Sequence, residues 1–360
     1  KQASVSESND VSTGEQTSIS ASATNIDTFT TATFDSAFYL AVTKDEINDE
    51  VSTAQISLVH DNSSAMVSAG GGVQSGDNAQ LTYTADINSG TVRLRGTGTA
   101  AVNSIKFYKI GLGDNTSASS AGNVATIINT DVDSAVENLD TWAHASYRGA
   151  KYYISMNNST NGEVGNIECL VTHNGSDAFI TNYNDVFTGS NSLVNSLTAD
   201  ISGDNVRLRA SCSPNTAVKM YRVLLSDAES DASSTNTKTV GQTTTSSSAS
   251  SMDSFVTDSA NGVHYIVVGN SSSESASSIS EVFVTTDGTD AYISTGPSVS
   301  TKGSDQLTFT AALSGTTVTV SSASTSGAST TVNAYRVNML RASAGAATSE
   351  QVLVSTTQTI

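Results

Sequence analysis

The chain alternates short apolar runs with polar turns rich in Ser, Thr, Asn and Gly. Residues 38–42 and 56–60 are short runs rich in β-forming side chains. Residues 81–87 and 92–95 instead alternate between apolar and polar positions, as strands do when one face is in water. No segment keeps the 3.6-residue apolar period of a helix. The pattern predicts an all-β chain of short strands.

The same pattern occurs three times at a fixed spacing. Each copy has an Asp two positions before a large aromatic residue, followed by two tyrosines, and these residues are predicted to form the structural core of the repeat. The spacing of equivalent residues is 113 (140 − 27 and 253 − 140), with 114 between the last two tyrosines. The set consists of Asp27, Phe29, Tyr39 and Tyr108; Asp140, Trp142, Tyr152 and Tyr221; and Asp253, Phe255, Tyr265 and Tyr335.

A repeat of this length has room for its own core and supplies about seven or eight strands, which predicts an antiparallel β-sandwich of Ig-like or jelly-roll-like type. We expect three tandem sandwiches arranged as beads on a string, since solenoid repeats are shorter. The expected boundaries are a flexible lead over residues 1–13, sandwiches over residues 14–113, 123–226 and 237–341, and a terminal strand over residues 350–360.

The terminal strand has two interpretations. Its Val352 and Val354 fall where the period places the first strand of a fourth repeat. In the favoured interpretation it closes the third sandwich, and each first strand belongs to the preceding sandwich. In the other, it is a donor strand that pairs with the sheet edge of another subunit.

Composition limits the classes of partner. Charged residues make up only 14% of the 360 residues, and the net charge is −18. Nucleic acids and anionic membranes both require clustered Lys and Arg, so neither is an expected partner. No apolar run is long enough to predict a transmembrane helix. Cys169 and Cys212 are interpreted as buried free thiols, with a single disulfide bridge as the alternative.

No residue pattern indicates an enzyme, and no catalytic residue, metal site or cofactor is expected. His60 and His173 are equivalent positions in two repeats, replaced by Thr286 in the third, and are interpreted as a structural feature. Acidic clusters are candidate Ca²⁺ ligands, but they lack EF-hand offsets and are interpreted as solvated loops. These clusters are Asp45, Glu46, Asp49 and Glu50; Asp131, Asp133 and Glu137; and Asp287 and Asp290.

Two further sets of charged residues receive structural interpretations. The Asp that precedes each aromatic is expected to cap a turn beside the buried ring. Four arginines on alternating strand positions are expected to pair with neighbouring carboxylates on a wet face. They are Arg93, Arg95, Arg207 and Arg209.

The middle repeat resembles a module found in virion structural proteins of tailed phages that infect marine cyanobacteria, often described as fibre-like. Repeats one and three keep only parts of it, with Phe38 and His264 where repeat two has Lys151. The matching pieces are Asp140-Thr-Trp142, Tyr147-Arg-Gly-Ala-Lys-Tyr152, Glu168-x-Leu-Val-Thr-His-Asn-Gly175, Ala178-Phe-Ile-Thr-x-Tyr183, Ala199-Asp-Ile-x-Gly203 and Asn205-Val-Arg-Leu208.

The resemblance implies an exposed, non-enzymatic virion component, either a fibre or appendage segment or a capsid-surface decoration protein. Its expected partners are copies of itself, in a homo-oligomer for which a trimer is the default, and other virion proteins. The expected location is the virion surface, outside the cell. Two alternatives stay open: an extracellular adhesin or filament subunit assembled by strand donation, and an array of carbohydrate-binding modules whose ligand is a host-surface glycan.

Overall fold

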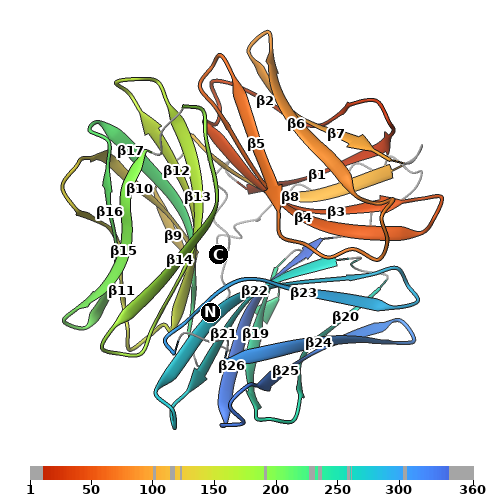
Figure 1. The fold of residues 1–360 in the computed structure, drawn as a ribbon, viewed down its shortest axis with the longest axis vertical. Helices are drawn as coiled ribbons and strands as arrows, with labels where there is room; N and C mark the ends of the chain where they lie inside the picture. The colour runs from red at the N-terminus through yellow and green to blue at the C-terminus, as the bar shows by residue number, and fades with distance from the viewer. Residues whose placement is uncertain are drawn as a thin grey trace, which may run out of the picture.

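The computed structural model confirms an all-β chain built from antiparallel sheets (Figure 1). No helix occurs among the residues that the structure describes. These are residues 11–99, 103–113, 118–121, 124–189, 193–226, 232–233, 237–257, 260, 262–302 and 306–339. Their strands form three large sheets and three small ones, which pair as three sandwiches.

Sandwich one pairs a five-stranded sheet with a three-stranded sheet. The large sheet has the order β1-β8-β3-β4-β5, with β1 Val11–Ile19, β8 Asn103–Leu112, β3 Ser36–Asp45, β4 Glu50–His60 and β5 Ala65–Gly70. The small sheet has the order β2-β7-β6, with β2 Thr24–Thr30, β7 Thr91–Gly98 and β6 Leu81–Asn88.

Sandwich two repeats this topology with one additional short edge strand. Its large sheet has the order β14-β13-β12-β17-β10-β9, with β14 Ala178–Phe187, β13 Val164–His173, β12 Gly149–Asn158, β17 Thr216–Leu225, β10 Val124–Val132 and β9 Ser119–Ala121. Its small sheet has the order β11-β16-β15, with β11 Glu137–Ala143, β16 Asn205–Cys212 and β15 Val194–Ser202.

Sandwich three has the same arrangement as sandwich two. Its large sheet has the order β18-β19-β26-β21-β22-β23, with β18 Ala232–Ser233, β19 Thr237–Thr245, β26 Thr330–Met339, β21 Gly262–Ser271, β22 Ala276–Thr286 and β23 Ala291–Ser300. Its small sheet has the order β20-β25-β24, with β20 Ser250–Val256, β25 Thr317–Ser324 and β24 Leu307–Ser314.

The three sandwiches surround a common axis, with the large sheets inside and the small sheets outside (Figure 1). The inner strands are therefore buried on both faces. In β3, Tyr39 and Ala41 face the interior of sandwich one, while Phe38, Leu40 and Val42 face the axis. The small sheets alternate buried and partly exposed positions because their outer face meets water.

One hydrophobic cluster on the axis joins all three sandwiches, and we call it the axial core. It contains Tyr108, Tyr221 and Tyr335, which are equivalent residues of β8, β17 and β26. Other members include Phe38 from sandwich one, Leu170 from sandwich two and Ile266 and Phe283 from sandwich three. The expectation of separate beads on a string is therefore wrong, because the beads share a core.

The favoured interpretation of the first strands is also wrong. Each first strand pairs with the last strand of its own sandwich: β1 with β8, β10 with β17 and β19 with β26. No first strand closes the preceding sandwich among the described residues. β1 also begins at Val11, inside the expected flexible lead. The terminal strand with Val352 and Val354 lies outside the described residues, so strand donation stays a prediction.

Candidate functional site: a buried polar cluster on the axis

A group of polar side chains lies on the axis beside the axial core, and we call it the axial cluster. Its centre is formed by equivalent residues of the three sandwiches, Gln55 on β4, Glu168 on β13 and Glu281 on β22, which are 113 positions apart. The exposed fractions of these residues are 3%, 1% and 0%. The remaining members are Ser57, Lys151, Tyr183, Asn184 and His264.

Lys151 on β12 joins the two carboxylates. Its Nζ donates to Glu168 Oε2 and to the Tyr183 hydroxyl, and it lies 2.6 Å from Glu281 Oε1. The ammonium also lies 4.5 Å from the ring centroid of Tyr153 and 4.4 Å from that of Tyr183. Aromatic faces attract a cation, so the rings supplement the carboxylates around a side chain that is 0% exposed.

Neutral donors supply most of the other contacts to the carboxylates. Gln55 Nε2 donates to Glu281 Oε2 at 2.8 Å and to Glu168 Oε2 at 3.2 Å. Asn184 Nδ2 donates to Glu168 Oε1 at 2.6 Å, and the Tyr183 hydroxyl donates to Glu281 Oε1 at 2.6 Å. Since buried charges are costly unless they are paired and hydrogen-bonded, these donors are what allow the carboxylates to lie here.

The pKa shifts reflect this balance. Burial, together with the nearby Glu281 carboxylate, raises the pKa of Glu168 despite its contact with Lys151. Burial alone would raise the pKa of Glu281, but Lys151 and His264 outweigh burial and hold that pKa below its usual value. Burial would lower the pKa of Lys151, but the two carboxylates outweigh it and raise that pKa.

His264 on β21 lies at the edge of the cluster. Its Nε2 is 3.5 Å from Glu281 Oε2, and its ring is 4.7 Å from the ring of Phe283, measured between centroids. The side chain is 0% exposed, and neither ring nitrogen has a hydrogen-bond partner among the described residues. The imidazole therefore lies within ion-pairing distance of the Glu281 carboxylate, and it is shielded from water.

The cluster exists because the repeats differ at equivalent positions. Lys151 corresponds to Phe38 and His264, and Glu168 corresponds to Gln55. Tyr183 corresponds to Gly70 in repeat one. The cluster was not predicted from the sequence, although the 113-residue spacing aligns Gln55 with Glu168 and Glu281.

Chemically, the cluster can hold the sandwiches in one arrangement. Glu168 accepts a hydrogen bond from Gln55 of sandwich one, and Lys151 of sandwich two pairs with Glu281 of sandwich three. Asn166 Nδ2 of sandwich two also donates to Leu58 O of sandwich one at 3.1 Å. A displaced sandwich would leave these buried groups unpaired, at a cost of about 1–3 kcal/mol for each neutral group and more for a charge.

The predicted repeat-core residues form a second recurring structure. In each sandwich the Asp accepts a hydrogen bond from the first of the two tyrosines of the repeat and pairs with a cation from the last strand. These tyrosines are Tyr39, Tyr152 and Tyr265. The Tyr hydroxyl to Asp distances are 2.9, 2.8 and 3.1 Å in sandwiches one, two and three. The cation pairs are Lys109 with Asp27, Arg222 with Asp140, and Arg336 with Asp253.

These aspartates do not cap turns, so that expectation is wrong. Each lies within a strand of the small sheet, directly after a β-bulge, which occurs between Asn25 and Asp27 in β2 and at equivalent positions in β11 and β20. A bulge inserts an extra residue and redirects the side chains that follow. The bulge thereby turns both the Asp and the aromatic two positions later towards the interior of the sandwich.

The aromatic partners are buried as predicted. Phe29, Trp142 and Phe255 are 7%, 4% and 5% exposed. The Trp142 indole additionally donates to the Tyr152 hydroxyl at 3.0 Å. The predicted core residues thus meet in two places, inside each sandwich and, for the tyrosines of the last strand, on the axis.

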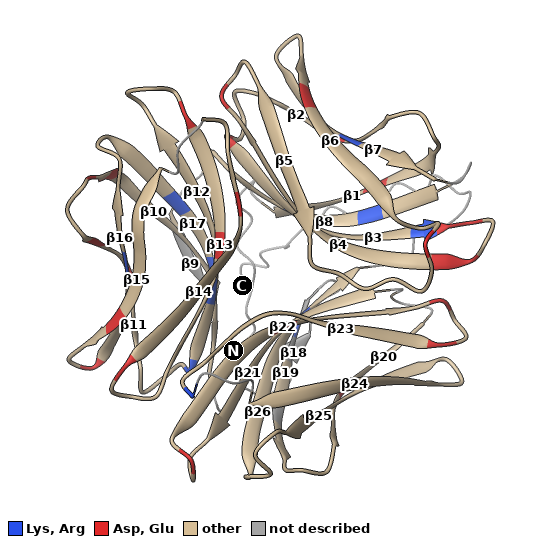
Figure 2. Ribbon diagram, viewed as in Figure 1, with Lys and Arg blue, Asp and Glu red and all other residues tan. Residues whose placement is uncertain are grey.

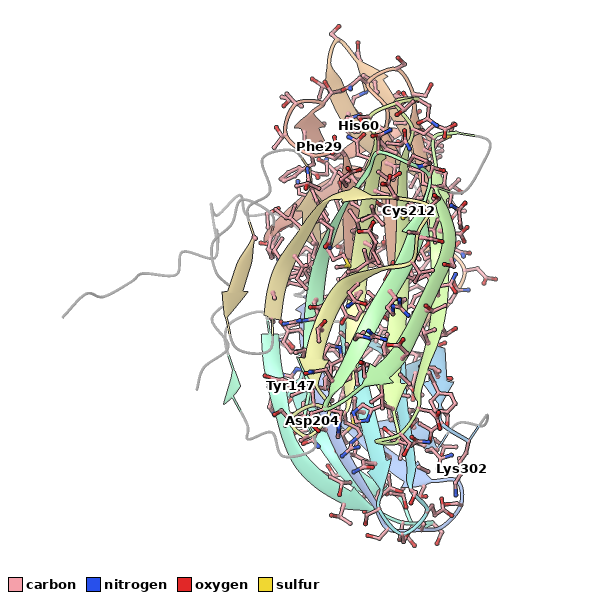
Figure 3. The ribbon with its side chains drawn as sticks, turned by 90° about the vertical axis from the view of Figure 1, so that its left-hand side faces the viewer. Phe29, His60, Tyr147, Asp204, Cys212 and Lys302 are labelled. Atoms are coloured by element: carbon pink, nitrogen blue, oxygen red, sulfur yellow. The ribbon has the colours of Figure 1, made fainter. Side chains whose placement is uncertain are left out.

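His60 and His173 form equivalent structural contacts. Nε2 of His60 donates to Phe34 O at 2.5 Å, and Nε2 of His173 donates to Tyr147 O at 2.8 Å. Nδ1 accepts a backbone N–H in both cases. The His60 ring lies 6.0 Å from that of Phe29, measured between centroids, in sandwich one (Figure 3).

The acidic clusters lie in turns and at the adjoining strand ends, and Figure 2 shows Asp and Glu gathered at loop tips around the rim. The interpretation as solvated loops is wrong for Asp45, the last residue of β3, which is 0% exposed. Asp45 and Asp287 accept backbone N–H groups two and three residues later. Among the described residues, no three His, Cys, Asp or Glu side chains are placed to hold a metal ion. Within the same part of the chain, no helix is long and apolar enough to cross a membrane.

The expected arginine pairs are present. Arg93 makes a two-point contact with Asp86, at 2.6 and 2.7 Å, and Arg95 Nη1 lies 3.3 Å from the same carboxylate. Arg207 and Arg209 bind Asp200 in the same way. Hydrogen bonding to Arg93 and to Arg207 lowers the pKa of each Asp. Cys169 and Cys212 are free and buried, as predicted.

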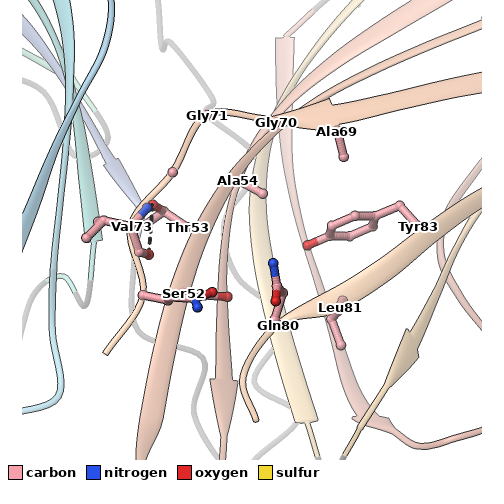
Figure 4. A pocket seen from close by; sticks show the side chains of 12 residues that line it. Ser52, Thr53, Ala54, Ala69, Gly70, Gly71, Val73, Gln80, Leu81 and Tyr83 are labelled. Atoms are coloured by element: carbon pink, nitrogen blue, oxygen red, sulfur yellow. Dashed lines mark hydrogen bonds between the residues drawn. The ribbon is translucent and has the colours of Figure 1, made fainter. Parts of the chain in front are cut away.

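A groove opens in sandwich one between β4, β5 and β6 (Figure 4). Its walls include Ser52, Thr53, Gly71 and Tyr83. The Ser52 and Thr53 hydroxyls already donate to backbone carbonyls, and Thr53 Oγ1 accepts the Val73 N–H. The Thr53 hydroxyl thus holds the chain just after the Gly-rich loop, at Val73, and the Ser52 hydroxyl holds it at Ala79.

Comparison with known proteins adds no relative. No protein-family model, no curated protein and no solved structure matches this chain.

Proposed function

We propose that this chain is a structural component of a phage virion, exposed on the particle as a capsid-surface decoration protein or as part of a fibre or appendage. The observation that carries the proposal is the arrangement of three equivalent sandwiches around one axis, with Gln55, Glu168 and Glu281 meeting on it. Subunits of a symmetric trimer contact one another in this way. One chain thus provides a threefold arrangement that matches a threefold position of a larger assembly.

Burial supports a mechanical role in preference to catalysis. Lys151, Glu168 and Glu281 form a buried cluster of charges, and their side chains are 0–1% exposed. A substrate has no path to such groups without separation of the sandwiches. The resemblance of repeat two to virion modules supports the same function, and a net charge of −18 favours the solubility of an exposed component.

The proposal includes self-association and contact with other virion proteins. Because the threefold contact is already made inside one chain, further copies would bind through the outer sheets or the ends of the sandwiches. Light scattering of the purified chain over a range of concentrations measures this directly. A measured mass of three chains would indicate a homotrimer. A measured mass of one chain would indicate that a single chain occupies each threefold position of the larger assembly.

Quantitative mass spectrometry and antibody labelling of gradient-purified virions test the function. We expect the chain to copurify with particles at a fixed copy number and the antibody to label intact particles on their surface. Absence from particles, with the chain instead in the cell-surface fraction of the host, would contradict the proposal and favour an adhesin or filament subunit.

A further inference from the structure

The axial cluster contains two buried carboxylates but only one buried cation. With Lys151 protonated and both Glu168 and Glu281 ionised, its net charge is −1, and all three side chains are 0–1% exposed. An uncompensated buried charge is strongly unfavourable, and a buried group usually shifts its protonation before it keeps one. Charge balance therefore requires one more proton in the docked state.

The groups that face the carboxylates leave two carriers for this proton. Gln55, Ser57 and Asn184, from β4 and β14, do not titrate. Burial raises the pKa values of the Tyr153 and Tyr183 hydroxyls, so both tyrosines stay neutral. The carriers that are left are the Glu168 carboxyl on β13 and the His264 imidazole on β21.

Both carriers have suitable geometry. Glu168 Oε1 lies 3.5 Å from the Ser57 hydroxyl, which can accept a hydrogen bond from a protonated carboxyl. His264 Nε2 lies 3.5 Å from Glu281 Oε2, where an imidazolium would pair with that carboxylate. We propose that the axial cluster is a one-proton site, which takes up a proton as the three sandwiches dock and releases it when they separate.

The chain itself contains a neutral version of this site. Gln55 occupies in sandwich one the position that Glu168 and Glu281 occupy in the others. A glutamine has the shape of a protonated glutamic acid but carries no exchangeable charge. Glu168→Gln therefore leaves one Lys and one Glu, a balanced pair that needs no additional proton.

The sign of the pH dependence follows. In the unfolded chain Glu titrates near 4.3 and His near 6.5, so above about pH 7 neither holds the proton. The docked state holds one proton more, so its stability is complete below the unfolded-state values and is lost as pH rises through the pKa of the docked cluster. Until that pKa is reached, the unfolding equilibrium constant is expected to rise about tenfold per pH unit from this site alone.

Urea unfolding of the full chain from neutral to alkaline pH, followed by Trp142 fluorescence, tests the proposal. Comparison of the wild type with Glu168→Gln cancels the titration of all other groups. The slope of the unfolding free energy against pH reports how many protons the folded state releases on unfolding. We expect that number to be smaller by one in Glu168→Gln than in the wild type. Glu15→Gln is the matched control, because Glu15 pairs with Lys106 on the periphery, 3.3 Å away, and it should keep the wild-type slope.

Equal slopes for the wild type and Glu168→Gln would overturn the proposal. If Glu168→Gln does not fold, carbon-13 NMR of the wild-type protein at neutral pH can instead report the protonation states of the Glu168 and Glu281 carboxyls and the His264 imidazole. A protonated Glu168 or an imidazolium at His264 supports the one-proton site. Two ionised carboxylates beside a neutral His264 would refute it. The outcome is independent of the proposed virion role, which particle labelling tests separately.

Discussion

Gln55 and Glu281 lie 226 positions apart in the sequence, yet Gln55 Nε2 donates a 2.8 Å hydrogen bond to Glu281 Oε2. This bond joins the first sandwich to the third. Lys151 of the second sandwich pairs with the same Glu281, so all three sandwiches meet at one carboxylate. The axial core extends the contact with apolar side chains, and the repeats thereby form one folded unit.

Removal of Asp253 should destabilise the protein strongly. Asp253→Ala leaves the Arg336 guanidinium, the Lys238 ammonium and the buried Tyr265 hydroxyl without their carboxylate. Breaking a buried ion pair by removing one partner costs about 3–5 kcal/mol. The change is measured as the free energy of unfolding in urea.

Asp200→Ala is the matched control for Asp253→Ala. Asp200 also binds arginine, but its side chain is 37% exposed and the pair lies on the outer sheet. Such pairs contribute about 0–1 kcal/mol. Equal losses for the two variants would show that the Asp–Tyr–cation group has no special role in stability.

Lys151→Met should destabilise the chain in a pH-dependent way. The substitution leaves Glu168 and Glu281 buried beside each other without a cation, at a cost of about 3–5 kcal/mol at neutral pH. Without Lys151, both burial and mutual repulsion raise the carboxyl pKa values in the folded state. Stability is then present below the unfolded-state values and is lost as pH rises, so mild acid should restore part of it.

The rescue of Lys151→Met distinguishes charge from packing. Adding Glu168→Gln and Glu281→Gln removes both carboxylates and should recover most of the loss, as read from urea midpoints. A loss that is the same in mild acid and at neutral pH, and that the two glutamines do not rescue, would assign the effect to packing alone.

The two cysteines should be unreactive in the folded protein. Burial raises the pKa of Cys169 to about 12 and that of Cys212 to about 11, and the thiolate is the reactive form. We expect mass spectrometry to find no alkylation at pH 8 without denaturant and two labels after unfolding. Rapid labelling of the folded chain would contradict the buried positions of the thiols. An intact mass lower by two hydrogen atoms, with no labelling after unfolding, would reveal a disulfide.

The sequence predicted strands and their period more reliably than their partners. The 113-residue spacing located Tyr39, Tyr152 and Tyr265 correctly in equivalent strands. The pairing of β10 could not be read from spacing, because β10 follows the end of sandwich one as regularly as it precedes the rest of sandwich two. Hydrogen-bonded partners depend on long-range geometry, which a period along the chain does not specify.

Docking on the axis could not be predicted for a related reason. The continuous apolar run at residues 38–42 is consistent with a strand buried on both faces, but it does not say what covers the second face. Lys151 and Glu168 interrupt such runs and resemble wet-face residues when each repeat is considered alone. Their pairing becomes visible only when three chain segments meet.

Differential scanning calorimetry of the full chain tests the docking of the three sandwiches most directly. A single cooperative unit requires a ratio of calorimetric to van 't Hoff enthalpy of about one, independent of protein concentration. Because the axial core and the axial cluster join the sandwiches, we predict one transition with that ratio. A ratio of about three, or three separable transitions, would show that the sandwiches unfold independently and would contradict the shared core.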